Sequence, residues 1–208
     1  MISTRTAGCL LAVFFLLHGV IPLTAKTLTF DEEKCHVDVP DDWKEQGSTE
    51  NKVSAINADQ TKSFTLRTVN VGAELRLDDA SFIKGFENSV TGNGFTITAR
   101  LHVSLAGIDA YALDASRTMP AGPVDTRMMV TVANNYAYCV NISKVNGMAA
   151  DDPELAAIVS SFGFTGTPEL PASQSDQLSF RLGELVGGVL LPVLVVIVLF
   201  KWIRRKRS

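Results

Sequence analysis

Residues 95–143 decide the fold and read FTITARLHVSLAGIDAYALDASRTMPAGPVDTRMMVTVANNYAYCVNIS. Apolar and polar residues alternate along most of this stretch, which is the period of a β-strand. Three turn signals interrupt the alternation: Gly107, the Ala-Gly-Pro segment at 121–123 and the Asn134–Asn135 pair. Strands joined by such short turns pair antiparallel, so the stretch predicts a meander of four long strands.

Two more strands and two helices flank the meander. Alternating runs predict strands over 35–39 and 63–71. The acidic pair at 78–79 can cap a helix that ends at the Gly-Asn-Gly segment 92–94, and Asp-Asp-Pro-Glu at 151–154 begins a second helix. The order β-β-α-β-β-β-β-α predicts an α+β domain in which helices pack on an antiparallel sheet.

Several segments carry a family resemblance. The first strand ends in Val39-Pro40-Asp41-Asp42-Trp43, the segment 107–111 (GIDAY) opens a long strand, and the last helix ends in 158–164 (IVSSFGF). With the helix around 81–83 and Tyr136 in the next-to-last element, they resemble the PsbP-like and Mog-type domains over residues 27–164. The resemblance implies an α/β/α sandwich. It also implies a non-catalytic binding or assembly role, since members include photosystem II assembly proteins, a Ran-binding protein and bacterial envelope lipoproteins.

The N-terminus is typical of a secretory signal peptide. Arg5 supplies a positive charge, an apolar run covers 8–21, and Ala25 offers a small residue for cleavage before Lys26. We predict a cleaved signal over residues 1–25, with an uncleaved signal anchor as the alternative.

The C-terminus is typical of a membrane anchor. The uncharged run from Leu185 through Pro192 to Phe200, extended by Trp202 at the interface, approaches the ~20 residues that a bilayer-spanning helix needs. Basic residues follow and favour a cytoplasmic tail: Lys201, Arg204, Arg205, Lys206 and Arg207. We predict a single transmembrane helix over 182–203, a basic tail over 204–208 and a flexible stalk over 165–181. The domain at 26–164 then lies outside the cytoplasmic membrane, in type I orientation, as a periplasmic domain if the cell is a bacterium.

The charge differs strongly between these parts. The whole chain has a formal net charge of −3, whereas residues 26–181 hold 13 basic and 21 acidic side chains, a net charge of −8. Phosphate binding needs a basic face, so this excess argues against nucleic acid as a partner. The expected partners are the lipid bilayer, through the C-terminal helix, and an envelope protein.

Two cysteines remain after signal removal. An even pair in an exported domain suggests a disulfide between Cys35 and Cys139, and two separate thiols are the alternative. The alternation already raises a difficulty, because Cys139 shares a strand face with Asn141 while Cys35 shares one with Val37 and Val39.

A polar sheet face is the candidate binding site. Its residues are expected to point away from the apolar side of their strands: Arg67, Arg100, His102, Asp114 and Arg127. On neighbouring strands they would form a mixed-charge groove for an acidic ligand or peptide. Cross-strand charge pairing on a wetted face is the alternative.

No sequence motif identifies a catalysed reaction. P-loop, G-x-S-x-G and dinucleotide-binding patterns are absent, and His36 and His102 lack zinc-site spacing, so no cofactor and no metal are expected. The acidic segment 31–33 suits a solvated edge better than a Ca²⁺ loop, and Asn141-Ile142-Ser143 is a glycosylation sequon.

The sequence therefore predicts a membrane-anchored extracytoplasmic module that binds or assembles without catalysis. Two alternatives stay open. One is a ligand-binding protein or small enzyme that uses the polar sheet face. The other is an accessory protein that acts through its membrane helix.

Overall fold

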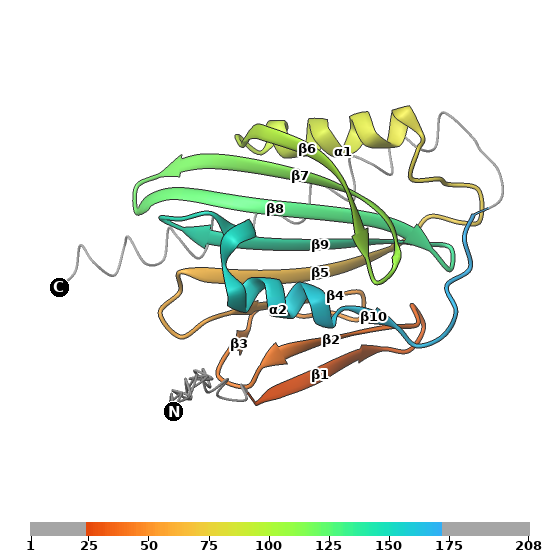
Figure 1. The fold of residues 1–208 in the computed structure, drawn as a ribbon, viewed down its shortest axis with the longest axis horizontal. Helices are drawn as coiled ribbons and strands as arrows, with labels where there is room; N and C mark the ends of the chain where they lie inside the picture. Colours follow the sequence, from red (N-terminus) through yellow and green to blue (C-terminus); the bar gives the residue numbers. More distant parts are fainter. Residues whose placement is uncertain (1–23, 172–208) are drawn as a thin grey trace, which may run out of the picture.

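The computed structural model describes residues 24–171 (Figure 1). Its elements, in chain order, are β1 (Ala25–Phe30), β2 (Cys35–Pro40), β3 (Lys44–Glu45), β4 (Lys52–Ile56), β5 (Lys62–Asn70), α1 (Ala80–Gly92), β6 (Thr96–Leu105), β7 (Ile108–Met119), β8 (Gly122–Ala133), β9 (Tyr136–Val145), the 3₁₀ turn η1 (Ala149–Asp151), α2 (Pro153–Ser161) and β10 (Gly163–Phe164).

A seven-stranded antiparallel sheet forms the centre of the domain. Its strand order is β3-β4-β5-β9-β8-β7-β6, so the predicted meander occupies one half of it as four neighbouring strands. The other half is built from β5, which pairs with β9, and from β4 and β3 beyond it. A second, three-stranded sheet of order β1-β2-β10 completes the fold.

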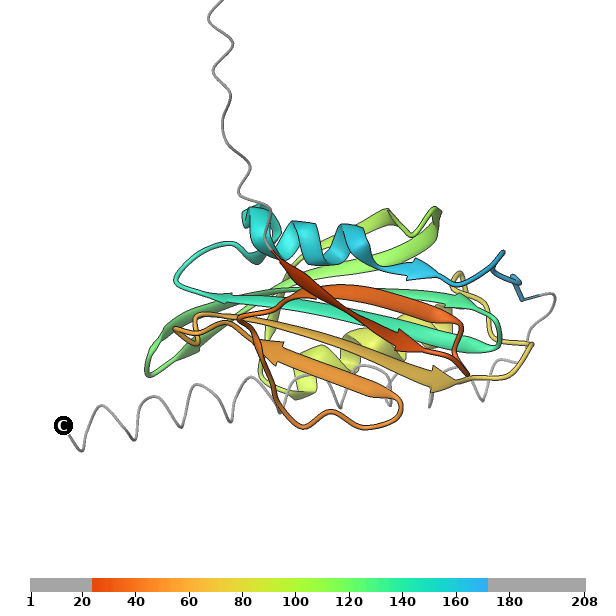
Figure 2. The ribbon, with the colours of Figure 1, turned by 90° about the horizontal axis from the view of Figure 1, so that it is seen from below.

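The large sheet is covered on both faces. Helix α1 lies on one face, while α2 and the small sheet lie on the other (Figure 2). Two apolar clusters fill the layers. One joins α1 to the sheet through Phe82 and Phe86, and the other joins α2 and the small sheet through Leu155, Phe162 and Val37. This α+β arrangement matches the predicted fold class.

The predicted helix starts are confirmed. The carboxylate of Asp79 accepts hydrogen bonds from the backbone N–H of Ser81 and Phe82 at 2.8 and 3.2 Å. The carboxylate of Asp152 accepts from Glu154 and Leu155 at 3.1 and 3.2 Å. Each aspartate thus satisfies N–H groups that have no partner within the first helical turn.

The strands β1, β3, β4 and β10 were not predicted. β3 and β10 have only two residues each, and β1 is a largely exposed edge strand that begins at Ala25, the last residue of the predicted signal peptide. Their position depends on pairing with distant segments. Gly163 of β10, for example, lies so close to the ring of His36 on β2 that a Cβ there would come within 2.7 Å of it.

The predicted disulfide is wrong. Both thiols are free and buried. Cys35 belongs to the apolar cluster of the small sheet, and Cys139 belongs to the cluster beneath α1. The large sheet lies between the two clusters, and a disulfide needs Cβ atoms ~4 Å apart. Burial raises the pKa of the Cys35 thiol to about 12, with a smaller contribution from the charge of Glu33, and this disfavours the thiolate form.

The predicted membrane segments lie outside the described residues. Between residues 24 and 171 no helix is long and apolar enough to cross a bilayer. The predicted span at 182–203, the basic tail at 204–208 and residues 1–23 of the signal belong to the rest of the chain. Residues 165–171, assigned to the stalk, lie against the domain, since the N–H of Thr165 donates to the carbonyl of Lys34 at 2.9 Å.

Candidate functional site

A groove of about 500 Å³ opens at the end of the molecule that holds the β6–β7 turn. Four chain segments contribute to its walls: residues 76–78 before α1, residues 107–109 after the turn, Val132 on β8 and residues 170–171. His102 of β6, one of the predicted site residues, completes the lining.

The groove combines apolar surfaces with charged ones. Leu77, Ile108, Val132 and Leu170 supply apolar contact area, and Leu170 is 64% exposed. Two of the charged groups pair with each other, because both terminal oxygens of Asp78 accept hydrogen bonds from Arg76, at 2.9 and 3.0 Å. Apolar walls with a few polar groups at the margin are typical of binding sites.

Asn134 holds the segment 165–171, in which residues 170 and 171 line the groove. Its N–H donates to the carbonyl of Glu169 at 2.8 Å, and its side-chain oxygen accepts from the N–H of Glu169 at 2.9 Å. Asn134 can do this because it adopts a left-handed backbone (φ 51°), as does Asn135 (φ 67°), in the turn between β8 and β9. The tight turn that the sequence predicted therefore also anchors the segment that closes the groove.

A hydrogen-bonded chain lies beside His102 beneath α1. Arg100 donates to the carboxylate of Glu87 at 2.8 and 2.9 Å, and the hydroxyl of Tyr111 donates to the same carboxylate. The His102 ring meets the Tyr111 ring edge-on at 5.7 Å between centroids. The bonds from Arg100, more than that from Tyr111, lower the pKa of Glu87, while burial and the bond to Glu87 raise the pKa of Tyr111. Arg100, Glu87 and Tyr111 therefore bond to one another, and Tyr111 packs against His102, which lines the groove.

The five predicted face residues do not form one groove. Arg100 and His102 lie on the α1 side of the sheet, opposite Leu113 and Tyr111. Asp114 and Arg127 lie on the other side, where they are cross-strand neighbours joined by bonds of 2.6 and 2.7 Å.

Arg67 shares the α1 side but lies on β5, separated from β6 by three strands. The physical reason is that both faces of the sheet are buried. The apolar residues of one strand can therefore point to the opposite face from the apolar residues of the next strand. A bulge between Ile97 and Ala99 adds to this by changing the register of β6.

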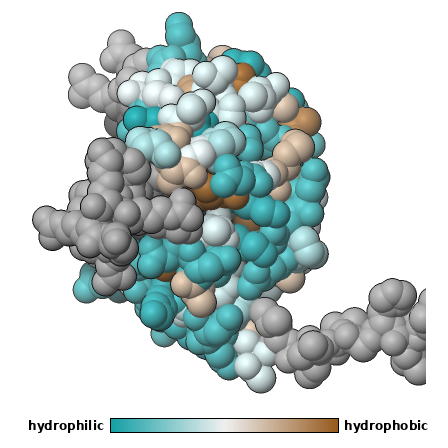
Figure 3. Space-filling view, turned by 90° about the vertical axis from the view of Figure 1, so that its left-hand side faces the viewer, coloured by the Kyte–Doolittle hydropathy of each residue, from teal (hydrophilic) through white to brown (hydrophobic). Residues whose placement is uncertain are grey.

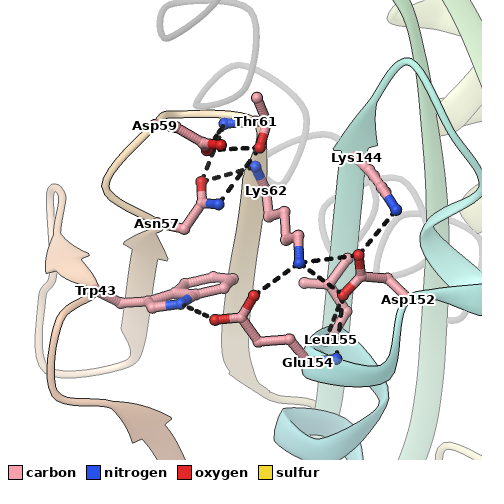
Figure 4. Close-up of polar contacts among 9 residues, drawn as sticks. All are labelled: Trp43, Asn57, Asp59, Thr61, Lys62, Lys144, Asp152, Glu154 and Leu155. Carbon is pink, nitrogen blue, oxygen red and sulfur yellow. Dashed lines mark hydrogen bonds and ion pairs between the residues drawn. The ribbon is translucent and has the colours of Figure 1, made fainter.

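A second polar cluster ties α2 to the sheet (Figure 4). Lys62 lies 3.0 Å from Asp152 and 2.7 Å from Glu154, and Lys144 lies 2.9 Å from Asp152. Glu154 also accepts a 2.8 Å bond from the indole N–H of Trp43, the last residue of the V-P-x-x-W segment. Sequence reasoning did not foresee this cluster, although Asp152 and Glu154 were assigned to the helix start.

The environment of Asp152 explains its low pKa. Burial alone would raise it, but hydrogen bonds from Lys144, Lys62 and the N–H of Leu155 outweigh burial and lower the pKa to about 2. Because its charged groups all pair with one another, the cluster stabilises the fold. The nearby turn is closed by Asn57, whose side-chain oxygen accepts from the N–H of Thr61 and Lys62 at 3.0 and 2.9 Å (Figure 4).

The described surface offers little apolar area elsewhere. The end of the molecule at the left of Figure 1 is mainly hydrophilic, with apolar atoms in small patches (Figure 3). Within residues 24–171, Met148 and Leu170 are the exposed large apolar side chains. The sequon residue Asn141 is 3% exposed and accepts a hydrogen bond from Thr126, so it is not accessible to a glycosylating enzyme in the folded domain.

Solved structures resemble this domain to different degrees. The cyanobacterial PsbP of Synechocystis matches with a TM-score of 0.53 at 10% identity, over 70% of this chain and 95% of that chain. The Ran-binding protein Mog1p of Saccharomyces cerevisiae gives a TM-score of 0.49 at 10% identity, over 69% and 96%. A Bacteroides thetaiotaomicron protein gives 0.48 at 16% identity over 67% of this chain, which spans about half (48%) of that protein.

The match to cyanobacterial PsbP confirms a PsbP-like fold, as the resemblance in the sequence implied. No protein-family model matches the chain, and no curated protein sequence matches it either.

Proposed function

We propose that this protein is a non-catalytic binding module, displayed outside the cytoplasmic membrane by its C-terminal segment, and that the groove at the β6–β7 turn receives its ligand. The observation that carries the proposal is the groove itself, whose apolar walls are assembled from four separate chain segments. Such a surface suits a short apolar segment of another envelope protein.

The electrostatics support a neutral or weakly charged ligand. Arg76 and Asp78 at the margin neutralise each other, and the Glu87–Arg100 pair does the same behind the wall. The remaining acidic side chain of the lining is Asp109. The net charge of −8 over residues 26–181 also disfavours an acidic partner.

Site-specific photocrosslinking in intact membranes tests the proposal. A photoreactive residue at Ile108, inside the groove, is compared with one at Lys84 on the exposed side of α1. We expect a defined protein adduct from position 108, none from 84, and loss of the adduct when Leu170→Asp is introduced. Equal adducts from both positions, or from an anchor-only control, would refute the groove as the binding site.

A further inference from the structure

Two cations face each other across β4 and β5. Lys52 and Arg67 are directly opposite in the strand register, and Arg67 is in turn opposite Cys139 of β9. Because opposite residues share a face, all three lie on the α1 side of the sheet. Like charges in such a cross-strand pair are destabilising.

The pair has no acidic counterpart among residues 24–171. Neither side chain forms an ion pair there, and Nη1 of Arg67 is buried without a hydrogen-bond acceptor. Burial and the charge of Arg67 lower the pKa of Lys52, and burial lowers the pKa of Arg67. A buried donor without a partner costs free energy and calls for an explanation.

Other half-buried cations of the domain have acidic partners. Lys62 and Lys144 face Asp152, and Arg127 faces Asp114, each at 3.0 Å or less. The unpaired state of Lys52 and Arg67 is therefore a specific property of this position on the sheet.

The neighbouring groups are neutral hydrogen-bonding side chains. The hydroxyls of Ser54 and Thr65, the next pair on the same face and two residues along each strand, lie 3.1 Å apart. Asn141 of β9 is opposite Thr65. A guanidinium fork, an ammonium and adjacent hydroxyls match the oxygens of a carboxylate or phosphate group.

We propose that Lys52 and Arg67 form a binding site for one oxyanion group, a carboxylate or a phosphate. The anion would accept hydrogen bonds from the guanidinium of Arg67 and the ammonium of Lys52, and its charge would offset their repulsion. The site lies on different strands from the groove and does not depend on the proposed function.

Two sources can supply the group. One is an external anion. The other is a carboxylate of residues 172–208, in which Asp176 and Glu184 are the acidic side chains. The shared chemistry allows one assay to separate the sources.

The assay is thermal unfolding of the full-length protein in non-ionic detergent at pH 7, with sodium phosphate against sodium chloride at equal ionic strength. Phosphate also stabilises proteins by exclusion from their surface, so the response is read against Lys52→Gln/Arg67→Gln. Lys84→Gln, on the exposed side of α1, is a control that removes one charge elsewhere. For a filled site we expect an excess Tm rise of about 4–7 °C at tenfold the Kd.

An excess rise in the wild type and in Lys84→Gln, absent from the double variant, supports the site with an external anion. No excess in the wild type but an excess in Asp176→Asn/Glu184→Gln supports the site and identifies the chain's own carboxylate as its occupant. If neither protein responds more than the double variant, the proposal is wrong.

Discussion

The substitution Asp152→Asn tests how the polar cluster beneath α2 stabilises the domain. Asparagine keeps the helix cap but removes the charge that faces Lys62 and Lys144. The native pKa of Asp152 is about 2 against a usual 3.8. At about 1.4 kcal/mol per pH unit, this difference corresponds to about 2.5 kcal/mol of stability at pH 7.

The pH dependence follows from the sign of the shift. The native pKa lies below the unfolded value, so the stabilisation is fully present above about pH 4 and is lost as the pH falls through about 2. The wild type should therefore lose stability over this range, and the deficit of Asp152→Asn should shrink with it.

Urea unfolding of the full-length protein, followed by the circular dichroism of the sheet at pH 7, 4 and 2.5, measures the difference. Asp78→Asn is the control, because its exposed pair with Arg76 contributes at most ~1 kcal/mol. A variant within about 0.5 kcal/mol of the wild type at pH 7, or an equal deficit at all three pH values, would refute the reasoning.

Three further predictions concern the core, the thiols and the groove. Phe86→Ala should lower the free energy of unfolding by about 3–5 kcal/mol, because the ring is fully buried beneath α1 and contacts Tyr111; a loss below ~1 kcal/mol in urea titration would contradict this packing. A reducing agent should leave Tm unchanged, because Cys35 and Cys139 are free; a drop on reduction would reveal a disulfide. Leu170→Asp should abolish crosslinking from the groove while changing stability by less than about 0.5 kcal/mol, because this side chain is 64% exposed; a large Tm loss would show that it is structural.

The helix starts and one tight turn could be predicted from the sequence. Asp79 and Asp152 were recognised as helix starts and Asn134–Asn135 as a tight turn, since caps and turns depend on groups only a few residues apart. The same reasoning assigned His102 to a mixed-charge groove with Arg100 and Arg127, whereas in the structure His102 lines a different groove that contains neither arginine. This reasoning missed Leu170 and the residues at 76–78, for which no local signal exists.

The sequence by itself determined the local elements: the four-stranded meander, both helices with their caps, and the separation of a charged domain from two apolar ends. Only the tertiary structure decided which face of the sheet each side chain occupies. Period-2 alternation assigns two sides to a strand but does not relate the sides of separate strands when both faces are buried. The packing of the small sheet on one face of the large sheet separates Cys35 from Cys139. The registers of β6, β7 and β8 divide the predicted polar face, and the pairing of β4 with β5 brings Lys52 opposite Arg67.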